Sequence, residues 1–257
     1  MKLFNTLYFA IFLILLAGCG GKGVNKQTGM EVDTISVPDT GFTGVTQFMS
    51  GPNNSLLVSE VTFKNGFRHG LTKTFYQNGR LQRTYWYEYG LRQDSSCWYY
   101  MEGQVFRTTP YRNDTVEGIQ KQYYRTGEIK AKLGYSKGYR TLFFEEYTRD
   151  GKLVKGYPEV VVKTEDSYAK NGTYKITLEP GDKKTDMKFF RGDLFYGIYD
   201  TTRVDRIKTA GNAATINLRK AGSQQPAHVG VIAEVLTNYG NRLLVYKKID
   251  LPYSDLK

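Results

Sequence analysis

Apolar and polar residues alternate in short runs between Phe63 and Pro158, and the whole pattern recurs every 24 residues. Two columns mark this period, one of glycines (Gly79, Gly103, Gly127 and Gly151) and one of aromatic residues (Phe63, Tyr87, Tyr111 and Tyr135). Self-similarity at a fixed period is typical of arrays in which each unit buries a face against its neighbours. Alternation with a period of two predicts half-buried strands rather than helices.

Each unit carries two turn signals. One set is Asn78-Gly79, Glu102-Gly103, Thr126-Gly127 and Asp150-Gly151; the other is Asn65-Gly66, Tyr89-Gly90, Asn113-Asp114 and Lys137-Gly138. Glycine and asparagine tolerate the positive φ angles of tight hairpin turns. We therefore expect an all-β, antiparallel meander of about eight strands. A first hairpin within Gly41–Glu60 is expected to cover its open edge.

The repeated motif is a pair of aromatic residues, a residue followed by glycine, an aliphatic residue, and then aromatic-x-x-Gly-x-x-x-Gly. It resembles the second type of the MORN-variant repeat (membrane occupation and recognition nexus) over residues 63–158. The resemblance implies a β-hairpin array and extends to bacterial proteins catalogued as antitoxin components. Three positions depart from the motif, because Asp94, Asp114 and Leu142 replace glycines.

The 24-residue period is lost after Pro158, so we place a domain boundary there, between repeats in residues 41–158 and a domain in residues 159–257. Seven candidate strands follow: Glu159–Lys163, Thr173–Glu179, Asp186–Arg191, Leu194–Tyr199, Ala214–Arg219, His228–Leu236 and Arg242–Ile249. Short strands separated by turn signals, with no helical period, predict a small immunoglobulin-like β-sandwich.

Residues 1–19 have the organisation of a signal peptide. Lys2 supplies a positive charge, and the apolar run from Leu7 to Leu16 is too short for a stable membrane span. The following Leu16-Ala17-Gly18-Cys19 resembles the lipobox of bacterial lipoproteins. This resemblance implies cleavage before Cys19, lipidation of Cys19, and anchoring in a membrane by the acyl chains. The alternative is an ordinary secretory signal whose cleavage site contains a cysteine.

Residues 20–40 are rich in Gly, Asn, Thr and Asp without periodicity, which is typical of a flexible tether. The residue directly after Cys19 is glycine and not aspartate, and the next few residues contain no acidic cluster. By analogy with bacterial lipoproteins, we expect attachment to the outer membrane facing the periplasm, with surface exposure as the alternative.

The positive charge lies mainly on the repeats. Residues 63–158 hold 17 Lys and Arg against 9 Asp and Glu, out of a formal net charge of +11 for the chain. Such an excess attracts acidic polymers or anionic headgroups. Cys19 and Cys97 are the two cysteines, so lipidation of Cys19 leaves Cys97 as an unpaired thiol, or as one half of an intermolecular disulfide.

Known catalytic motifs are missing from the sequence. His69 and His228 are the two histidines, and neither lies in a recognisable Ser/His/Asp or Cys/His motif. One remaining cysteine and two scattered histidines do not make a zinc site, and nucleotide-binding fingerprints are absent. We expect no enzymatic activity, no cofactor and no metal; a hydrolase on the sandwich, with the histidines as bases, is an alternative.

Aromatic and basic residues are interleaved along the repeats. The candidate binding surface comprises Tyr85, Trp86, Tyr87, Trp98, Tyr100 and Tyr124 together with Arg83, Arg107 and Lys130. Tyr and Trp offer flat faces with a polar group, which suit sugars and protein partners. The alternative is that these side chains only build the sheet through cross-strand pairs. Export of the chain argues against nucleic acid, which basic aromatic surfaces otherwise suit.

The sequence therefore predicts a non-catalytic envelope lipoprotein. Its array would serve as a binding or scaffolding surface for a protein partner or an acidic envelope polymer. The alternative is an antitoxin- or immunity-like protein that neutralises a toxin, which rests on the resemblance to repeat proteins catalogued in that way.

Overall fold

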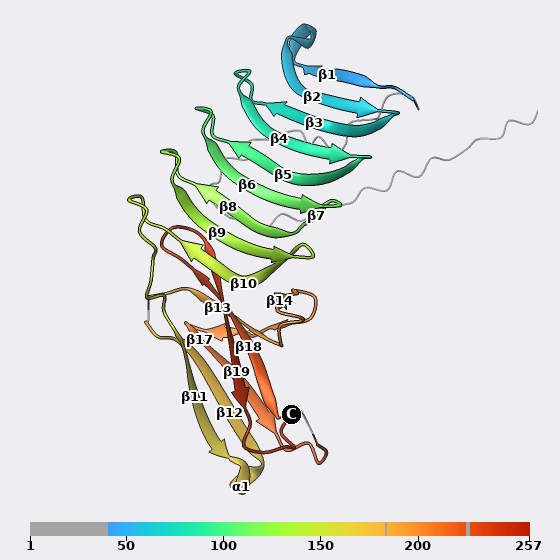
Figure 1. The fold of residues 1–257 in the computed structure, drawn as a ribbon. Helices are drawn as coiled ribbons and strands as arrows, with labels where there is room; N and C mark the ends of the chain where they lie inside the picture. The colour runs from blue at the N-terminus through green and yellow to red at the C-terminus, as the bar shows by residue number, and fades with distance from the viewer. Residues whose placement is uncertain (1–40, 183, 225–226) are drawn as a thin grey trace, which may run out of the picture. The chain divides into compact units, whose positions relative to one another are not determined.

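The computed structural model describes residues 41–182, 184–224 and 227–257, to which all structural statements refer. The predicted signal peptide, Cys19 and the tether of residues 20–40 lie outside the described residues. Strands dominate the described chain (Figure 1), which confirms the predicted all-β class.

The first part of the chain forms the array. Its strands are β1 (Gly44–Ser50), β2 (Leu56–Lys64), β3 (Phe67–Phe75), β4 (Leu81–Glu88), β5 (Leu91–Tyr99), β6 (Val105–Arg112), β7 (Thr115–Val116), β8 (Gly118–Tyr123), β9 (Ile129–Ser136) and β10 (Tyr139–Glu146), with the short 3-10 helix η2 (Pro52–Asn54) between β1 and β2. The strands pair antiparallel in sequence order, and β7 pairs with β6. The predicted antiparallel meander is confirmed.

The second part contains nine strands and one short helix. They are β11 (Val160–Ser167), α1 (Tyr168–Asn171), β12 (Thr173–Pro180), β13 (Met187–Arg191), β14 (Ile198–Tyr199), β15 (Asp205–Arg206), β16 (Thr209–Ala210), β17 (Ala213–Arg219), β18 (His228–Leu236) and β19 (Arg242–Asp250). Six of the seven predicted strands therefore appear, five with bounds within one residue, while β11 continues four residues beyond the predicted end at Lys163.

The two sets of turns in the array have different geometries. In the set that begins with Asn65-Gly66, both central residues have positive φ, between 47° and 86°, which is type I′ geometry. In the other set only the glycine has positive φ. There the amide of Gly79 donates to the carbonyl of Tyr76 at 2.9 Å, and the amide of Tyr76 donates to the carbonyl of Arg80 at 2.8 Å. This is a type I turn followed by a glycine bulge.

A bulge recurs in the second strand of each hairpin, where the pairing register shifts by two residues. In β3 it falls at Gly70, with φ of 89°, and the next equivalent positions are Asp94 at 55° and Gly118 at 107°. Asp94 thus adopts the backbone conformation of the glycine that it replaces, whereas Leu142, at the fourth equivalent position, does not have a positive φ. Bulges bend and twist strands, and the array strands are visibly bent (Figure 1).

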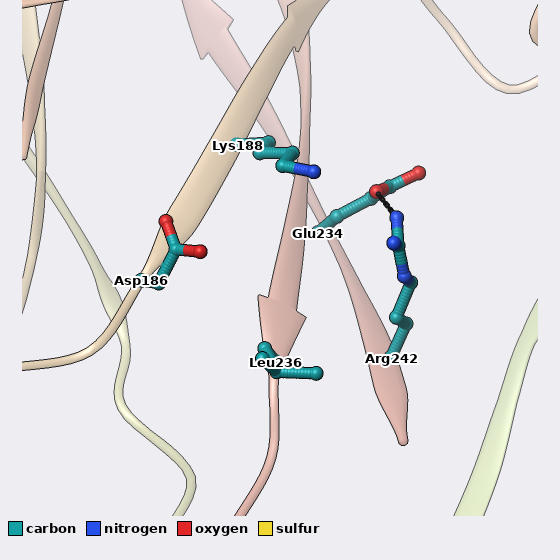
Figure 2. A pocket seen from close by; sticks show the side chains of 5 residues that line it. All are labelled: Asp186, Lys188, Glu234, Leu236 and Arg242. Carbon is teal, nitrogen blue, oxygen red and sulfur yellow. Dashed lines mark hydrogen bonds and ion pairs between the residues drawn. The ribbon is translucent and has the colours of Figure 1, made fainter. Parts of the chain in front are cut away.

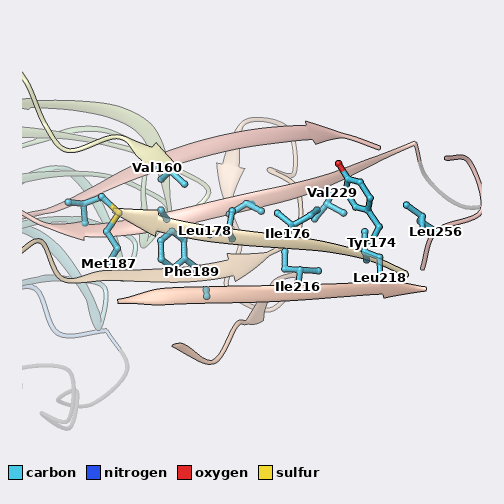
Figure 3. Packing of buried hydrophobic residues seen from close by; sticks show 14 residues of the cluster. Val160, Tyr174, Ile176, Leu178, Met187, Phe189, Ile216, Leu218, Val229 and Leu256 are labelled. Carbon is cyan, nitrogen blue, oxygen red and sulfur yellow. The ribbon is translucent and has the colours of Figure 1, made fainter. Parts of the chain in front are cut away.

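The second part is a sandwich of two four-stranded sheets, with strand orders β11-β12-β17-β16 and β15-β13-β18-β19. Labelled A to G along the chain, these orders become A-B-E-D and C′-C-F-G, as in immunoglobulin-like sandwiches. Both sheets contribute to one apolar core (Figure 3), with Ile176, Leu178 and Ile216 from one sheet and Phe189 and Val231 from the other. The predicted sandwich is therefore confirmed.

One predicted strand has a different place. Only Ile198–Tyr199 of the expected Leu194–Tyr199 strand is extended, and it pairs with Arg140 and Thr141 of β10 rather than joining the sandwich. This segment thus occupies the last edge of the array sheet. The sequence pattern does not show which strand a distant extended segment pairs with.

A buried carboxylate joins the array to the sandwich. Glu146 at the end of β10 is fully buried. Its Oε1 accepts hydrogen bonds from Thr237 Oγ1 at 2.8 Å and Asn241 Nδ2 at 2.7 Å, and its Oε2 accepts one from the Tyr157 hydroxyl at 3.1 Å. Thr237 and Asn241 belong to the turn between β18 and β19, so this contact connects the last array strand to that turn.

Candidate functional site

The array sheet has an inner face, which we define as the face that carries its buried residues. Val61, Phe63 and Tyr87 are buried on it, whereas their sequence neighbours point to the outer face. Because successive side chains alternate across a strand, this division follows from the predicted period of two. The two faces of the sheet therefore present different sets of side chains.

A row of directly paired residues crosses the inner face, and we call it the Arg–Trp row. It runs through Ser59, Thr74, Arg83, Trp98, Arg107, Gln122, Ala131 and Glu146. At its centre, the Cζ atoms of Arg83 and Arg107 lie 3.8 Å and 4.2 Å from the ring centre of Trp98. The arginines come from β4 and β6 on either side of β5, so they cover opposite faces of the indole.

These two arginines lack an acidic partner among the described residues. Neither forms an ion pair with a described carboxylate, and the Nε atoms of both are buried without a hydrogen-bond partner within residues 41–182, 184–224 and 227–257. Burial lowers the pKa of Arg107, and the nearby charge of Arg83 acts in the same direction. Stacking on Trp98 offsets part of this cost, since a cation–π contact contributes about 1–2 kcal/mol when desolvated.

Cations on the outer face are arranged differently. Lys73 Nζ lies 2.7 Å from Glu60 Oε1, and Lys132 Nζ lies 2.8 Å from Glu145 Oε2. The Glu145 partner and the Tyr147 hydroxyl raise the pKa of Lys132 to about 12. The outer face therefore neutralises these lysines within the sheet, whereas the centre of the inner face leaves two guanidinium charges available.

Polar side chains surround the central arginines. Ser59, Thr72, Ser96, Thr109 and Gln120 are buried on the inner face. Gln120 Nε2 donates to Thr109 Oγ1 at 3.1 Å, while the hydroxyls of Ser59 and Thr72 have no partner among the described residues. A buried hydroxyl without a partner costs free energy, and at 0% exposure Ser59 and Thr72 belong to the packed interior of this face.

The structure separates the nine predicted surface residues into groups. Arg83, Tyr85, Tyr87, Trp98 and Arg107 share the inner face. Tyr87 is only 2% exposed, and Tyr85 lies against it with 6.2 Å between ring centres.

The other four predicted residues lie elsewhere. Trp86 points to the outer face and is 43% exposed. Lys130 lies beside a register shift between β8 and β9. Tyr100 and Tyr124 lie at the turns and have a structural role, described next.

A ladder of tyrosine hydroxyls ties successive units together. The hydroxyls of Tyr76, Tyr100 and Tyr124 donate to the carbonyls of Tyr99, Tyr123 and Tyr147 at 2.6, 2.8 and 2.7 Å, each in the following unit. Burial raises the pKa of all three donors. The ladder was not predicted from the sequence, although Tyr76, Tyr100 and Tyr124 form a tyrosine column with a 24-residue period.

The sandwich has a small, half-open pocket of about 40 Å³ lined by Asp186, Lys188, Glu234, Leu236 and Arg242 (Figure 2). Arg242 Nη1 lies 2.9 Å from Glu234 Oε2, so these two charges satisfy each other. The cavity contains none of the predicted surface residues.

The two histidines lie in separate parts of the fold. His228 Nε2 is 3.2 Å from both carboxylate oxygens of Asp193, to which the Tyr246 hydroxyl donates at 2.6 Å. His69 lies against the ring of Tyr89, with 5.1 Å between ring centres. Cys97 is a half-buried free thiol.

The described chain contains neither a cluster of metal ligands nor a helix that could cross a membrane. Within it, no three His, Cys, Asp or Glu side chains are grouped to hold a metal ion. The helices of the same residues are too short and polar to cross a membrane.

No protein-family model matches the chain, and no curated protein matches it. The resemblance to MORN-variant repeats and to lipoproteins stays a prediction from the sequence.

Proposed function

We propose that this protein is a non-catalytic, lipid-anchored component of the bacterial envelope whose array binds an acidic envelope polymer or a protein partner. Cys19 would carry the anchor, and the inner face of the array would carry the binding surface. Facing the periplasm from the outer membrane is the location that the sequence favours.

One observation supports the proposal above all others. Arg83 and Arg107 are held in place on the inner face with no carboxylate partner among the described residues. Both side chains are half-buried with their Nε atoms fully buried, and charges withdrawn from water in proteins are normally paired. A ligand that supplies the missing negative charge would resolve this imbalance, and an acidic polymer is a ligand of that kind.

Photo-crosslinking in living cells tests the proposal with the full chain. A photoreactive amino acid replaces Gln122, which neighbours Arg107 in the Arg–Trp row, and in a matched control it replaces the exposed Lys121 on the outer face. We expect adducts with an envelope component from position 122 and few from position 121. Equal labelling from both positions, or none from either, would contradict binding by the inner face.

A further inference from the structure

The strand β1 forms an open edge of the array sheet (Figure 1). It pairs with β2 on one side, and on its other side it has no partner among the described residues. An edge strand exposes backbone N–H and C=O groups that can pair with another chain, and proteins usually protect such an edge with a very short strand or with charged residues. The other sheet edges of this protein show whether it follows that practice.

Every other sheet edge of the described chain is protected in one of these two ways. The strands β7, β14, β15 and β16 are only two residues long. The strands β11 and β19 are longer but charged, with Lys163, Glu165 and Asp166 in β11 and Arg242, Lys247, Lys248 and Asp250 in β19. By contrast, β1 has seven residues and none of them is charged. The edge at β1 therefore lacks both kinds of protection.

The lack of charge extends beyond β1 itself. Residues 41–59 contain no Asp, Glu, Lys or Arg, in a chain of which 24% is charged. Val45 and Met49 lie on the exposed face of β1 and are 57% and 42% exposed, although both are apolar. β1 therefore combines open backbone groups with exposed apolar side chains, which is the kind of surface that another extended strand binds.

The residues directly before β1 are held on its closed side. The amide of Gly66 donates to the carbonyl of Phe42 at 2.8 Å, and the amide of Asn65 donates to Thr43 Oγ1 at 2.9 Å. Both donors belong to the β2–β3 turn. A tight hairpin that returned the chain along the open edge would need Phe42 and Thr43 for its own turn. This arrangement disfavours the chain's own preceding residues as the strand that binds there.

The side chains of β1 complement a second copy of the same strand. Antiparallel pairing about a twofold axis at Gln47, the central residue, places Val45 of each copy opposite Met49 of the other. The two Gln47 side chains meet at the axis, where their amides can donate to and accept from each other. No charge faces a like charge. Shifting this register by two residues in either direction places both apolar residues opposite glycine or a polar residue.

We propose that two copies of this protein pair through β1, antiparallel and in the register centred on Gln47, to form one continuous sheet. A second copy is favoured over a foreign strand, because β1 carries no charge by which a foreign strand would be selected. Self-pairing also leaves neither array with an open edge, since β14 covers β10 in each copy. The inference goes beyond the proposed function, because it concerns the sheet edge and not the ligand of the inner face.

The proposed lipid anchor at Cys19 favours this pairing. A seven-residue strand pair buries little surface, so association in dilute solution is weak. Residues 20–43 can span up to about 80 Å when fully extended, whereas the N-terminal ends of two paired β1 strands lie about 20 Å apart. Two copies anchored in one membrane therefore reach each other, and confinement to that membrane raises their effective concentration.

Cysteine cross-linking in cells that express the full chain tests the pairing. In a Cys97→Ser background, Gln47→Cys places the two introduced thiols opposite each other at the twofold axis. Mild oxidation with diamide should then give a disulfide-linked dimer, because directly paired residues have the Cα separation that a disulfide requires. Val45→Cys in the same background is the matched control. Its thiols lie about 13 Å apart along the strands, so it should give little dimer.

Charge pairs test the register and the identity of the partner. In the Gln47→Cys background, Val45→Lys/Met49→Lys places like charges opposite each other twice, so the yield of linked dimer should fall about tenfold or more. The matched variant Val45→Lys/Met49→Glu changes the same two exposed residues but places opposite charges across the axis. Its yield should stay close to that of Gln47→Cys alone. Cooperative thermal unfolding of both variants checks that they fold.

Four results would overturn the inference. They are the absence of linked dimer from Gln47→Cys, equal yields from positions 45 and 47, linkage of Gln47→Cys to a different protein, and equal losses in the two charge variants. The last result would show that β1 meets a foreign strand or an apolar surface rather than its own copy. Adducts from position 122 on the inner face do not depend on any of these outcomes, so the pairing and the proposed function can fail separately.

Discussion

Removing the tyrosine ladder tests how the units of the array are held together. The change is Tyr76→Phe, Tyr100→Phe and Tyr124→Phe, alone and combined, which deletes three hydroxyls and keeps the rings. Each hydroxyl donates to a carbonyl of the following unit at 2.6–2.8 Å. A neutral hydrogen bond contributes a net stabilisation of about 1 kcal/mol.

The three sites lie in successive units and share no donor or acceptor, so their effects should be nearly additive. We therefore expect the triple variant to lose about 3 kcal/mol of unfolding free energy, measured by urea denaturation. The control Tyr196→Phe changes a side chain that is 86% exposed, and its effect should stay within about 0.5 kcal/mol.

Alkaline pH provides a second measurement of the same ladder. Because burial raises the folded-state pKa of the three tyrosines, the unfolded state loses their protons first as pH rises above about 10. Stability should fall there, and it should fall less steeply in the triple variant. A triple variant that loses less than about 1 kcal/mol would refute the interpretation of the ladder as a structural tie.

Three further predictions concern the backbone, the joint and acid stability. Gly118→Ala places a side chain at φ of 107° and should lower the unfolding free energy by about 1 kcal/mol or more, with an unchanged melting temperature as the contrary result. Glu146→Ala removes the acceptor of three hydrogen bonds, from Thr237, Asn241 and Tyr157, and should lower the unfolding free energy measured in urea by roughly 2–3 kcal/mol; a variant as stable as the parent would show that the joint is dispensable. The backbone amide of Lys137 lowers the pKa of Glu117, and the Lys132 ammonium lowers the pKa of Glu145. The contribution of these two carboxylates to stability is therefore complete above pH 4.5, and it is lost as the pH falls through their lowered folded-state pKa values. Denaturation between pH 6 and pH 2 should show this loss, and Glu117→Gln/Glu145→Gln should make the pH dependence shallower.

The fold was predictable from the sequence where the chemistry is local. Gly79 and Asn65-Gly66 indicate turns because few other residues adopt positive φ, and alternation indicates strands because the pleat has a period of two. The strand at Ile198–Tyr199 was placed in the sandwich instead of against β10, because pairing between segments far apart in sequence leaves no mark in either segment. The helix α1 at Tyr168–Asn171 was not predicted, since a single turn is too short for a helical pattern.

The candidate site was predictable as a set of residues but not as an arrangement. Arg83, Trp98 and Arg107 were singled out as aromatic and basic side chains, yet their direct cross-strand pairing depends on a register fixed by the bulges. Trp86 was grouped with them although its side chain points to the other face. Burial of the polar residues Thr109 and Gln120 was also hidden, because nothing in their sequence neighbourhood distinguishes them from exposed ones.

The array sheet has two unlike ends. At one end the edge of β10 is paired with β14, and Glu146 is bonded to the β18–β19 turn. At the other end β1 pairs only with β2 among the described residues. Adding or removing a 24-residue hairpin in the interior would thus change the distance between β1 and the sandwich while leaving the closed end intact. The number of hairpins therefore sets the length of the array, while the contacts at its β10 end stay the same.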